Sequence, residues 1–228
     1  MDAIPYPGLR EILSGITSSG GSISLVSGRS AFEVAQLLAL DPLPEIWGCH
    51  GWECLRPDIG LEQLPLSSDQ LNGLTKAIVE LQGLGLEDRL ETKYGSLAIH
   101  WRGLPEAEAN RIRRLSGDVM KPVAGWKLAL REFDGGLELR ALGRDKGSAV
   151  RSILASNPKD AFCAYLGDDQ TDEDAFVEVK KAGGLALLVR PETRPTNADS
   201  WIVPPDELLD FLHRWKSLLK NGPNPRTV

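Results

Sequence analysis

The 228-residue sequence has few cysteines, no long apolar run and no cluster of basic residues. Its three cysteines, Cys49, Cys54 and Cys163, are odd in number and lack Cys-x-x-Cys spacing, which argues against a disulfide framework and against a zinc site. No segment approaches the roughly 20 apolar residues of a membrane span, and the first residues lack the basic and apolar parts of a signal peptide. We therefore expect a cytoplasmic protein with no membrane partner.

The composition is that of a folded, acidic protein. Hydrophobic residues make up 42% of the chain and charged residues 25%, which is enough for one large domain or two smaller ones. The net charge is −6, and the Lys and Arg residues are dispersed along the chain. A nucleic-acid partner is not expected, because binding to a phosphate backbone needs a basic patch. The sequence does not predict the oligomeric state.

Helical and strand spacing of apolar residues alternate at both ends of the chain. In the first part, this pattern predicts a helix over 9–16, a strand over 22–26, a helix over 31–40 and a strand over 45–47. In the last part, it predicts helices over 147–155, 172–182 and 206–219, and strands over 161–166 and 185–189. Alternation of this kind is typical of a doubly wound parallel sheet, so we predict the α/β class.

The middle of the chain has a different pattern. A helix over 71–81 is followed by short alternating strands over 97–101 and 126–131, with a helix opened by Pro105 between them. Asp134-Gly135-Gly136 is typical of a hairpin turn. We therefore predict a core formed by residues 1–54 and 140–228, interrupted by an inserted α+β cap over 55–139.

The most informative stretch runs from Asp168 to Asp174, where five of seven residues are acidic. Capping of the following helix explains Asp172 and its successors, because carboxylates are favoured at a helix N-terminus. It explains Asp168 and Asp169 less well, since they stand at the carboxyl end of a strand, where open α/β sheets place their sites. Two adjacent carboxylates repel unless a cation is present. Magnesium, with its preference for oxygen ligands, fits that requirement.

The stretch from Gly167 to Phe176 resembles the fourth motif of the haloacid dehalogenase superfamily, in the form found in trehalose-6-phosphate phosphatases. The resemblance implies that Asp168 ligates Mg²⁺. It further implies that Asp172 either holds a metal-bound water or orients Lys146.

Two further residues resemble phosphate-binding motifs of that family. Ser27, in Val-Ser-Gly-Arg after a strand, matches the second-motif serine that hydrogen-bonds the phosphoryl group, although such a turn is by itself more often plain structure. Lys146 matches the third-motif lysine at a helix start. A lysine there opposes the helix dipole, so its position favours an anionic partner.

The resemblance also implies a set of substrate-binding residues. Gly48-Cys49-His50-Gly51-Trp52-Glu53 resembles the family's Gly-Asn-His-Gly-x-Glu, with cysteine in place of asparagine. The residues expected to contact a small-molecule sugar phosphate are Arg29, His50, Glu91, Lys93, Arg102 and Glu138. For those in the cap, ordinary cross-strand ion pairing on a wet sheet face is the alternative interpretation.

The sequence lacks the superfamily's Asp-x-Asp-Gly-Thr motif, whose first Asp attacks phosphorus and whose second acts on the leaving oxygen. In the family this motif follows a strand in the middle of the sheet, so we expect neighbouring strands to have unpaired backbone groups. A late start, a fragment or a true loss would each explain the absence, and the first is favoured because Ser27, Lys146, Asp168 and Asp172 remain fit for catalysis.

The resemblance implies a Mg²⁺-dependent phosphoric monoester hydrolase that converts trehalose 6-phosphate to trehalose and phosphate once the missing segment is supplied. The chain as written is expected to be inactive. The alternatives are another sugar phosphatase of the same superfamily, or a catalytically inactive protein that binds a sugar phosphate.

Overall fold

The computed structural model describes residues 4–125, 127–158 and 161–221, which form two compact units. Unit 1 combines the two ends of the chain, up to Glu62 and from Asp145 onward, and unit 2 is Gln63–Arg144. The sequence analysis placed the insertion at 55–139, whereas the structure keeps the strands around residues 53–62 in unit 1. The reason is that these strands hydrogen-bond back to the preceding strand instead of to the inserted sheet.

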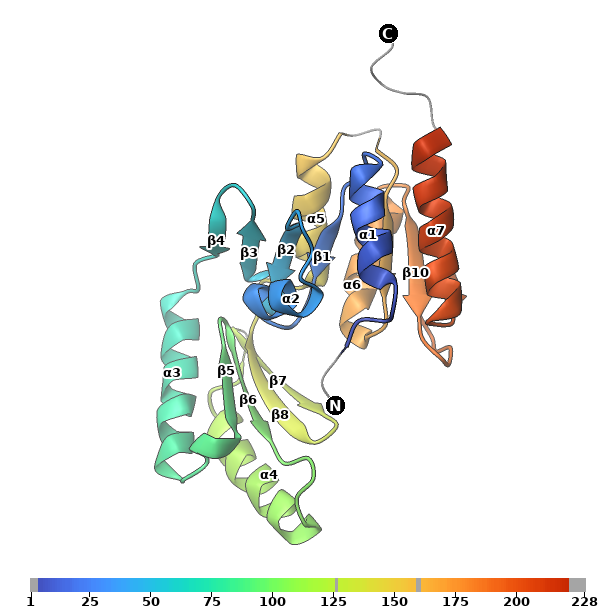
Figure 1. Ribbon diagram of the computed structural model, residues 1–228. Helices are drawn as coiled ribbons and strands as arrows, with labels where there is room; N and C mark the ends of the chain where they lie inside the picture. Colours follow the sequence, from blue (N-terminus) through green and yellow to red (C-terminus); the bar gives the residue numbers. More distant parts are fainter. Residues whose placement is uncertain (1–3, 126, 159–160, 222–228) are drawn as a thin grey trace. The chain divides into compact units, whose positions relative to one another are not determined.

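Unit 1 alternates helices and strands in the order shown in Figure 1. Its first segment contains α1 (Leu9–Ser18), β1 (Ser24–Val26), α2 (Ala31–Leu38), β2 (Glu45–Gly48), the 3₁₀ turn η1 (Cys49–Gly51), β3 (Glu53–Arg56) and β4 (Gly60–Gln63). Its second segment contains α5 (Lys146–Ser156), β9 (Ala164–Gly167), η3 (Gln170–Asp172), α6 (Glu173–Lys181), β10 (Leu185–Val189), β11 (Ser200–Ile202) and α7 (Asp206–Asn221). The α/β class predicted from the sequence is confirmed.

The helix starts of unit 1 follow from local side-chain chemistry. Ser30 caps α2 by accepting a hydrogen bond from Glu33 N, while the Glu33 carboxylate accepts one from Ser30 N at 2.9 Å. Asp145 caps α5 in the same reciprocal way with Ser148. Each cap satisfies backbone N–H groups that have no partner within the helix, and so fixes the first residue of the helix.

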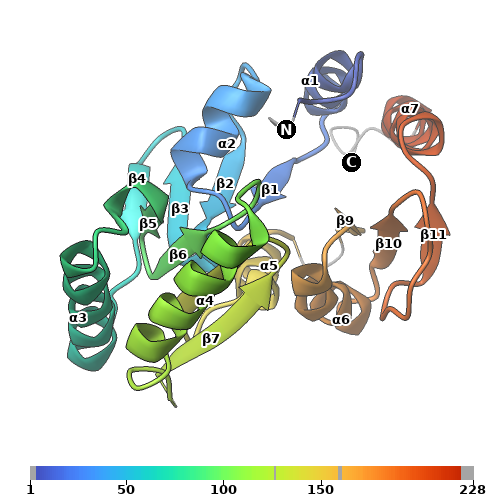
Figure 2. The ribbon, with the colours of Figure 1, turned by 90° about the horizontal axis from the view of Figure 1, so that it is seen from below.

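The strands of unit 1 form two separate sheets. One has the order β1-β2-β3-β4, with β1 parallel to β2, and the other has the order β11-β10-β9, with all three strands parallel. Within the described residues, β1 pairs only with β2 and β9 only with β10. Figure 2 shows β1 and β9 as the edges that the two sheets turn toward each other.

Helices join the two sheets of unit 1. On one face, α1 packs against α7, and their core residues Ile12, Ile16, Leu208 and Leu212 contact Ile23, just before β1, and Leu166 in β9. On the other, α5 contacts β1 and packs along α6, which contacts β9 and β10. The sheets are therefore held by shared helix layers, while their facing edges have no strand between them in the described part of the chain.

Unit 2 is a continuous antiparallel sheet with two helices. Its elements are α3 (Ser68–Gly83), η2 (Glu87–Arg89), β5 (Leu90–Lys93), β6 (Ser96–His100), α4 (Glu106–Met120), β7 (Leu128–Phe133) and β8 (Gly136–Ala141), and the strand order is β5-β6-β8-β7. The strand predicted over 126–131 is observed as β7, two residues later, and Trp126 lies outside the described residues.

The two faces of the unit 2 sheet differ in chemistry because side chains alternate along each strand. One face is apolar and includes the buried side chains of Leu97, Ile99 and Leu139, and the helices α3 and α4 contact the strands β6 and β8. Ala98 pairs with Glu91 on one side and with Glu138 on the other. These three residues alternate with the apolar set and so belong to the other face.

Among the described residues of the chain, no helix is long and apolar enough to cross a bilayer.

Candidate active site

Three segments of unit 1 place their polar residues where a strand ends or a helix begins. Ser27 follows β1, Asp168 follows β9, and Lys146 is the first residue of α5. In an open α/β sheet, the carboxyl ends of the strands are where ligands bind. We therefore take these positions as the starting point for the site.

A buried ion pair joins two of the predicted residues. The Lys146 ammonium donates to Asp172 Oδ1 at 2.8 Å, and the two side chains are only 9% and 3% exposed. The capped start of α5 places Lys146, and the turn of η3 places Asp172. The charge that a lysine adds to a helix N-terminus is thus balanced by a carboxylate from another element.

The Asp172 carboxylate is fully engaged by hydrogen-bond donors. In addition to Lys146, it accepts from the Tyr165 hydroxyl at 2.6 Å, from Asp168 N at 3.1 Å and from Asp169 N at 2.9 Å. Burial, followed by the charge of Asp172, raises the pKa of Tyr165 well above its usual value, so the phenol keeps the proton it donates. Of the two roles predicted for Asp172, this geometry favours orienting Lys146 over holding a water.

Asp168 has a different environment from Asp172. Its side chain reaches solvent, yet partial burial raises its pKa, the charge of Asp172 raises it further, and Lys146 opposes the shift. Within the described residues its carboxylate forms no ion pair with a Lys, Arg or His side chain. An ionised carboxylate that its surroundings disfavour is stabilised by a nearby cation, and its hard oxygen atoms suit Mg²⁺.

The donor set at Asp168 fits magnesium as one ligand of several. In residues 4–125, 127–158 and 161–221, no three side chains of Asp, Glu, His or Cys come together to hold a metal. Magnesium usually takes only one or two protein carboxylates and completes its shell with water and phosphate oxygens. The residues present are therefore compatible with a shared metal and phosphate site.

Ser27 lies in a tightly hydrogen-bonded turn after β1. Its N–H donates to Trp47 O at 2.8 Å, its hydroxyl oxygen accepts from Arg29 N at 3.1 Å, and its carbonyl accepts from His50 N at 3.0 Å. The Arg29 side chain is exposed. The turn therefore fixes the Ser27 backbone next to His50.

The η1 turn links Ser27 to the start of α5. Cys49, His50 and Gly51 have φ values of 49°, 56° and 92°, a left-handed conformation that only glycine adopts without strain. A Cβ atom at Gly28 would meet His50 Nε2 at 2.6 Å, and one at Gly51 would meet the Asp145 carbonyl oxygen at 2.9 Å. The close approaches bring the Ser27 turn, His50 and the Lys146 helix start together.

In unit 2, three of the four predicted sugar-binding residues share the polar face of the sheet. Lys93 forms an ion pair with Glu91 at 2.8 Å, and Glu138 stands two strands from Glu91 in the same cross-strand row. Arg102 instead follows β6 and binds the Asp134 carboxylate and carbonyl in the β7–β8 turn. The structure thus brings Glu91, Lys93 and Glu138 together and places Arg102 at the sheet's end.

Glu91 is well satisfied within that face. Burial alone would raise its pKa, but hydrogen bonds from Lys93 and from His100, whose Nε2 lies 2.7 Å from Glu91 Oε2, outweigh it and lower the pKa. The half-exposed cluster leaves polar atoms accessible, as a site for sugar hydroxyls requires.

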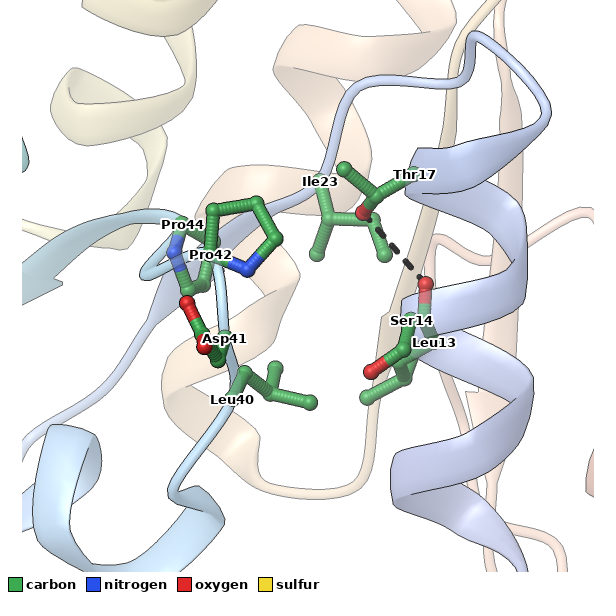
Figure 3. Close-up of a pocket in the computed structure, with 8 residues that line it drawn as sticks. All are labelled: Leu13, Ser14, Thr17, Ile23, Leu40, Asp41, Pro42 and Pro44. Carbon is green, nitrogen blue, oxygen red and sulfur yellow. Dashed lines mark hydrogen bonds between the residues drawn. The ribbon is translucent and has the colours of Figure 1, made fainter.

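Two hollows of very different size lie in unit 1. Figure 3 shows the smaller, about 10 Å³, lined by Leu13, Ser14, Thr17, Ile23, Leu40, Asp41, Pro42 and Pro44. It lies at the amino ends of β1 and β2, away from Ser27, and holds at most about one water. The larger, about 230 Å³, lies at the carboxyl end of β9 and is lined by Tyr6, Leu166, Gly167, Asp168, Val189, Pro204 and Leu208. Of these two hollows, the larger includes a predicted site residue, Asp168.

The sequence interpretation missed four residues that hold the site. Tyr165 has the alternation of a buried strand residue and gives no sign of its bond to Asp172. Arg190 and Arg194 donate to the carbonyl oxygens of Asp168 and Asp169, and Glu173 binds Arg194. Arg190 and Arg194 lie in a polar loop after a strand, and nothing in their local sequence indicates that they contact residues more than about 20 positions earlier in the chain.

Comparison with known proteins gives a consistent result. The trehalose-phosphatase family model matches residues 1–202. The chain is 31% identical over 207 residues to "Probable trehalose-phosphate phosphatase 4" of Oryza sativa subsp. japonica, covering 85% of this chain and 56% of the relative. It is 32% identical over 212 residues to the trehalose-phosphate phosphatase of Mycobacterium marinum, covering 86% and 52%. The chain thus spans little more than half of these relatives.

Solved structures support the fold. The C-terminal domain of C. albicans trehalose-6-phosphate phosphatase matches with a TM-score of 0.71 at 19% identity, covering 95% of this chain and 85% of that one. A haloacid dehalogenase-like hydrolase from B. subtilis matches with a TM-score of 0.58 at 13% identity, covering 92% and 93%. At these identities the matches establish the architecture alone.

Proposed function

Because the chain belongs to the trehalose-phosphatase family, we propose that it supplies the metal, phosphate and sugar subsites of an enzyme that hydrolyses trehalose 6-phosphate to trehalose and phosphate. The observation that carries the proposal is the buried Lys146–Asp172 pair beside the Asp168 carboxylate, at the carboxyl end of β9. A charge pair this deeply buried is costly to maintain, and such arrangements concentrate at functional sites.

The phosphoryl group would be bound by residues of unit 1. Lys146, oriented by Asp172, contributes positive charge, and the Ser27 hydroxyl contributes a hydrogen bond. Asp168 is the proposed Mg²⁺ ligand; when bound, the ion would offset the negative charge of the phosphate and its neighbours. Arg29 and His50, which flank the Ser27 turn, are proposed to contact the substrate beside the phosphate.

The sugar would be bound by unit 2. Glu91, Lys93 and Glu138 combine acceptors and donors on one sheet face, a suitable set for hydroxyl groups that both donate and accept. Arg102, at the end of the same sheet, is proposed to extend this surface. The partner is a small-molecule sugar phosphate, and the three free thiols support a reducing, cytoplasmic location.

The nucleophile would come from a strand between β1 and β9. The 228 residues contain no Asp-x-Asp-Gly-Thr motif, and both strand edges are open in the described structure. A parallel strand there would place an Asp at the carboxyl end of the sheet, next to Lys146 and Asp168. Its carboxylate oxygen would bond to phosphorus as the P–O bond to the sugar breaks, with the second Asp protonating the sugar oxygen. Water would then hydrolyse the aspartyl phosphate.

The test compares the purified 228-residue chain with the same chain carrying an upstream Asp-x-Asp-Gly-Thr strand taken from a relative. Phosphate release from trehalose 6-phosphate is measured with and without Mg²⁺, beside a panel of other sugar phosphates. We expect turnover only in the extended chain with Mg²⁺. Asp168→Ala should abolish it, whereas the exposed α7 substitution Asp210→Asn, used as a control, should not.

Two outcomes would contradict the proposal. Mg²⁺-dependent turnover by the short chain would require a different nucleophile. An extended chain that folds and binds sugar phosphate without turnover would instead favour the alternative of a silent binding protein, for which the absence of the motif is the supporting observation. Faster turnover of another sugar phosphate would change the substrate assignment alone.

A further inference from the structure

The backbone of Asp168 and Asp169 is held at both its donors and its acceptors. Both N–H groups donate to Asp172 Oδ2, at 3.1 and 2.9 Å. On the opposite side, Arg190 Nη1 donates to Asp168 O at 3.3 Å and Arg194 Nη2 donates to Asp169 O at 2.7 Å. A dipeptide held in this way has little backbone freedom, so these contacts set the direction of its Cα–Cβ bonds.

Arg194 forms more side-chain contacts than Arg190. Its side chain is 15% exposed and forms an ion pair with Glu173, which is 12% exposed. Glu173 also accepts from the Thr196 hydroxyl at 2.9 Å and from Asn197 N at 2.6 Å. Burial raises the pKa of Glu173, but the hydrogen bonds from Asn197, Arg194 and Thr196 outweigh it and lower the pKa, so the carboxylate stays ionised.

The distribution of charge around the acidic loop is selective. Lys146 pairs with Asp172 and Arg194 pairs with Glu173, while no described Lys, Arg or His side chain pairs with the Asp168 carboxylate. Arg194 contacts the Asp168–Asp169 dipeptide through the Asp169 carbonyl oxygen and through neither of its carboxylates. Its charge therefore offsets the acidic run without occupying the Asp168 carboxylate, which reaches solvent.

We propose that Arg194, held by Glu173, is a positioning residue that fixes the Asp168–Asp169 backbone so that the Asp168 carboxylate is presented to a divalent cation. The proposal rests on the metal role of Asp168 in the proposed function. It assigns a role in that site to a loop, residues 190–197, that follows β10 and has no place in the acidic motif itself.

The test measures Mg²⁺ binding by the 228-residue chain, without any need for turnover. Mg²⁺ is titrated while the amide NMR signals of Gly167, Asp168 and Asp169 are followed, in wild type and in Arg194→Met. Outer contacts that orient a metal ligand typically change affinity by about 10-fold or more, so we expect the apparent Kd to rise by roughly 10-fold. The control is Arg214→Met, which removes an exposed arginine from α7 and should leave the Kd unchanged.

A second variant separates positioning from folding. Arg194→Lys keeps the positive charge near Glu173 but lacks the fork that donates to two acceptors at once. We expect a native melting curve and a Kd between those of wild type and Arg194→Met. Glu173→Gln, which removes the charge that holds Arg194, should raise the Kd in the same direction.

The possible failures are distinguishable. If wild-type amides of Asp168 and Asp169 do not respond to Mg²⁺, the metal role in the proposed function fails, and the inference fails with it. If wild type responds but folded Arg194→Met and Arg194→Lys bind Mg²⁺ with unchanged Kd, the inference alone is overturned.

Discussion

The two units differ in how they hold the ion pairs of their proposed sites. In unit 1, Lys146 and Asp172 are almost fully buried, next to a turn with consecutive residues in the left-handed region and beside sheet edges with no strand neighbour in the described chain. In unit 2, Glu91, Lys93 and His100 are 40%, 24% and 41% exposed on a continuous sheet, and every described residue with positive φ is glycine. In unit 1, the left-handed residues Cys49 and His50 and the buried Lys146–Asp172 pair thus lie where chemistry is proposed, whereas the Glu91–Lys93 pair of the proposed sugar face stays partly exposed, although unit 2 also buries Arg140.

The strongest test of this contrast is to remove the lysine from a buried ion pair in unit 1 and from an exposed ion pair in unit 2. Lys146→Met leaves Asp172 buried with only its neutral donors, which should cost about 3 kcal/mol, the lower end for a broken buried pair because three hydrogen bonds remain. Lys76→Met in unit 2 removes an exposed pair with Glu80 and should cost less than about 0.5 kcal/mol. Urea unfolding of both variants measures the difference, and equal costs would contradict the contrast.

A second test concerns the strained turn. Gly51→Ala places a Cβ in the left-handed region and within 2.9 Å of the Asp145 carbonyl oxygen, so it should destabilise the protein by about 2–3 kcal/mol. Gly60→Ala is a matched control, since Gly60 has nearly the same φ, +91° against +92°, but open space around it. It should cost only about 1 kcal/mol. If thermal unfolding showed equal losses of stability for both variants, the close approach of Gly51 to the start of α5 would not contribute to the effect.

A third test compares strand edges by hydrogen exchange. Ser27 N donates to Trp47 O, so by alternation the Val26 N–H points to the open edge of β1. Leu139 in β8, by contrast, has strand neighbours on both sides, Leu97 and Leu130. We expect the Val26 amide to exchange at least about 10-fold faster than the Leu139 amide under native conditions. Adding the proposed strand should slow exchange at Val26 and leave Leu139 unchanged; no slowing would argue against its placement.

The smallest expected effect is on the pH dependence of stability, to which two carboxylates, Asp168 and Glu91, should contribute with opposite sign. The folded pKa of Asp168 is raised, so its ionisation destabilises the fold once the pH exceeds its unfolded value, and Asp168→Asn should stabilise the protein at pH 7 but not near pH 3. Because Asp168 reaches solvent, the gain should stay below about 0.5 kcal/mol.

Glu91 provides the counterpart. Its folded pKa is lowered, so it stabilises the protein above its unfolded pKa, and this contribution is lost as the pH falls through the folded pKa. Glu91→Gln should therefore destabilise the protein slightly at pH 7, by less than about 1 kcal/mol, and have no effect in acid. Free energies of unfolding at both pH values check the two signs, and the same sign for Asp168 and Glu91 would contradict the comparison.

Much of the fold was predictable because its signals are local. The apolar spacing around α1, α3 and α7 and the acidic run after β9 each act within a few residues. What the sequence could not reveal depends on distant contacts. In the sequence, Tyr165 looks like an ordinary core aromatic, and nothing nearby indicates its hydrogen bond to Asp172. The contacts of Arg190 and Arg194 depend on how β10 aligns with β9.

The boundary of the insertion was hard to predict for a related reason. The sequence analysis predicted no strand over 53–62 and began the insertion at residue 55, but β3 pairs with β2 through Trp47 and Cys54, which keeps it in unit 1. Pairing partners decide membership of a sheet, and alternation alone does not name the partner.

The polar face of unit 2 is encoded in a single uninterrupted stretch, Gln63–Arg144. Ser27, Lys146 and Asp168, in contrast, are spread over both segments of unit 1. Two recombination crossovers, near codons 62 and 144, would exchange the whole proposed sugar surface between genes and leave the proposed phosphate-binding residues unchanged. The proposed sugar surface can therefore be exchanged as one block, whereas exchange of the proposed phosphate-binding residues needs both segments of unit 1.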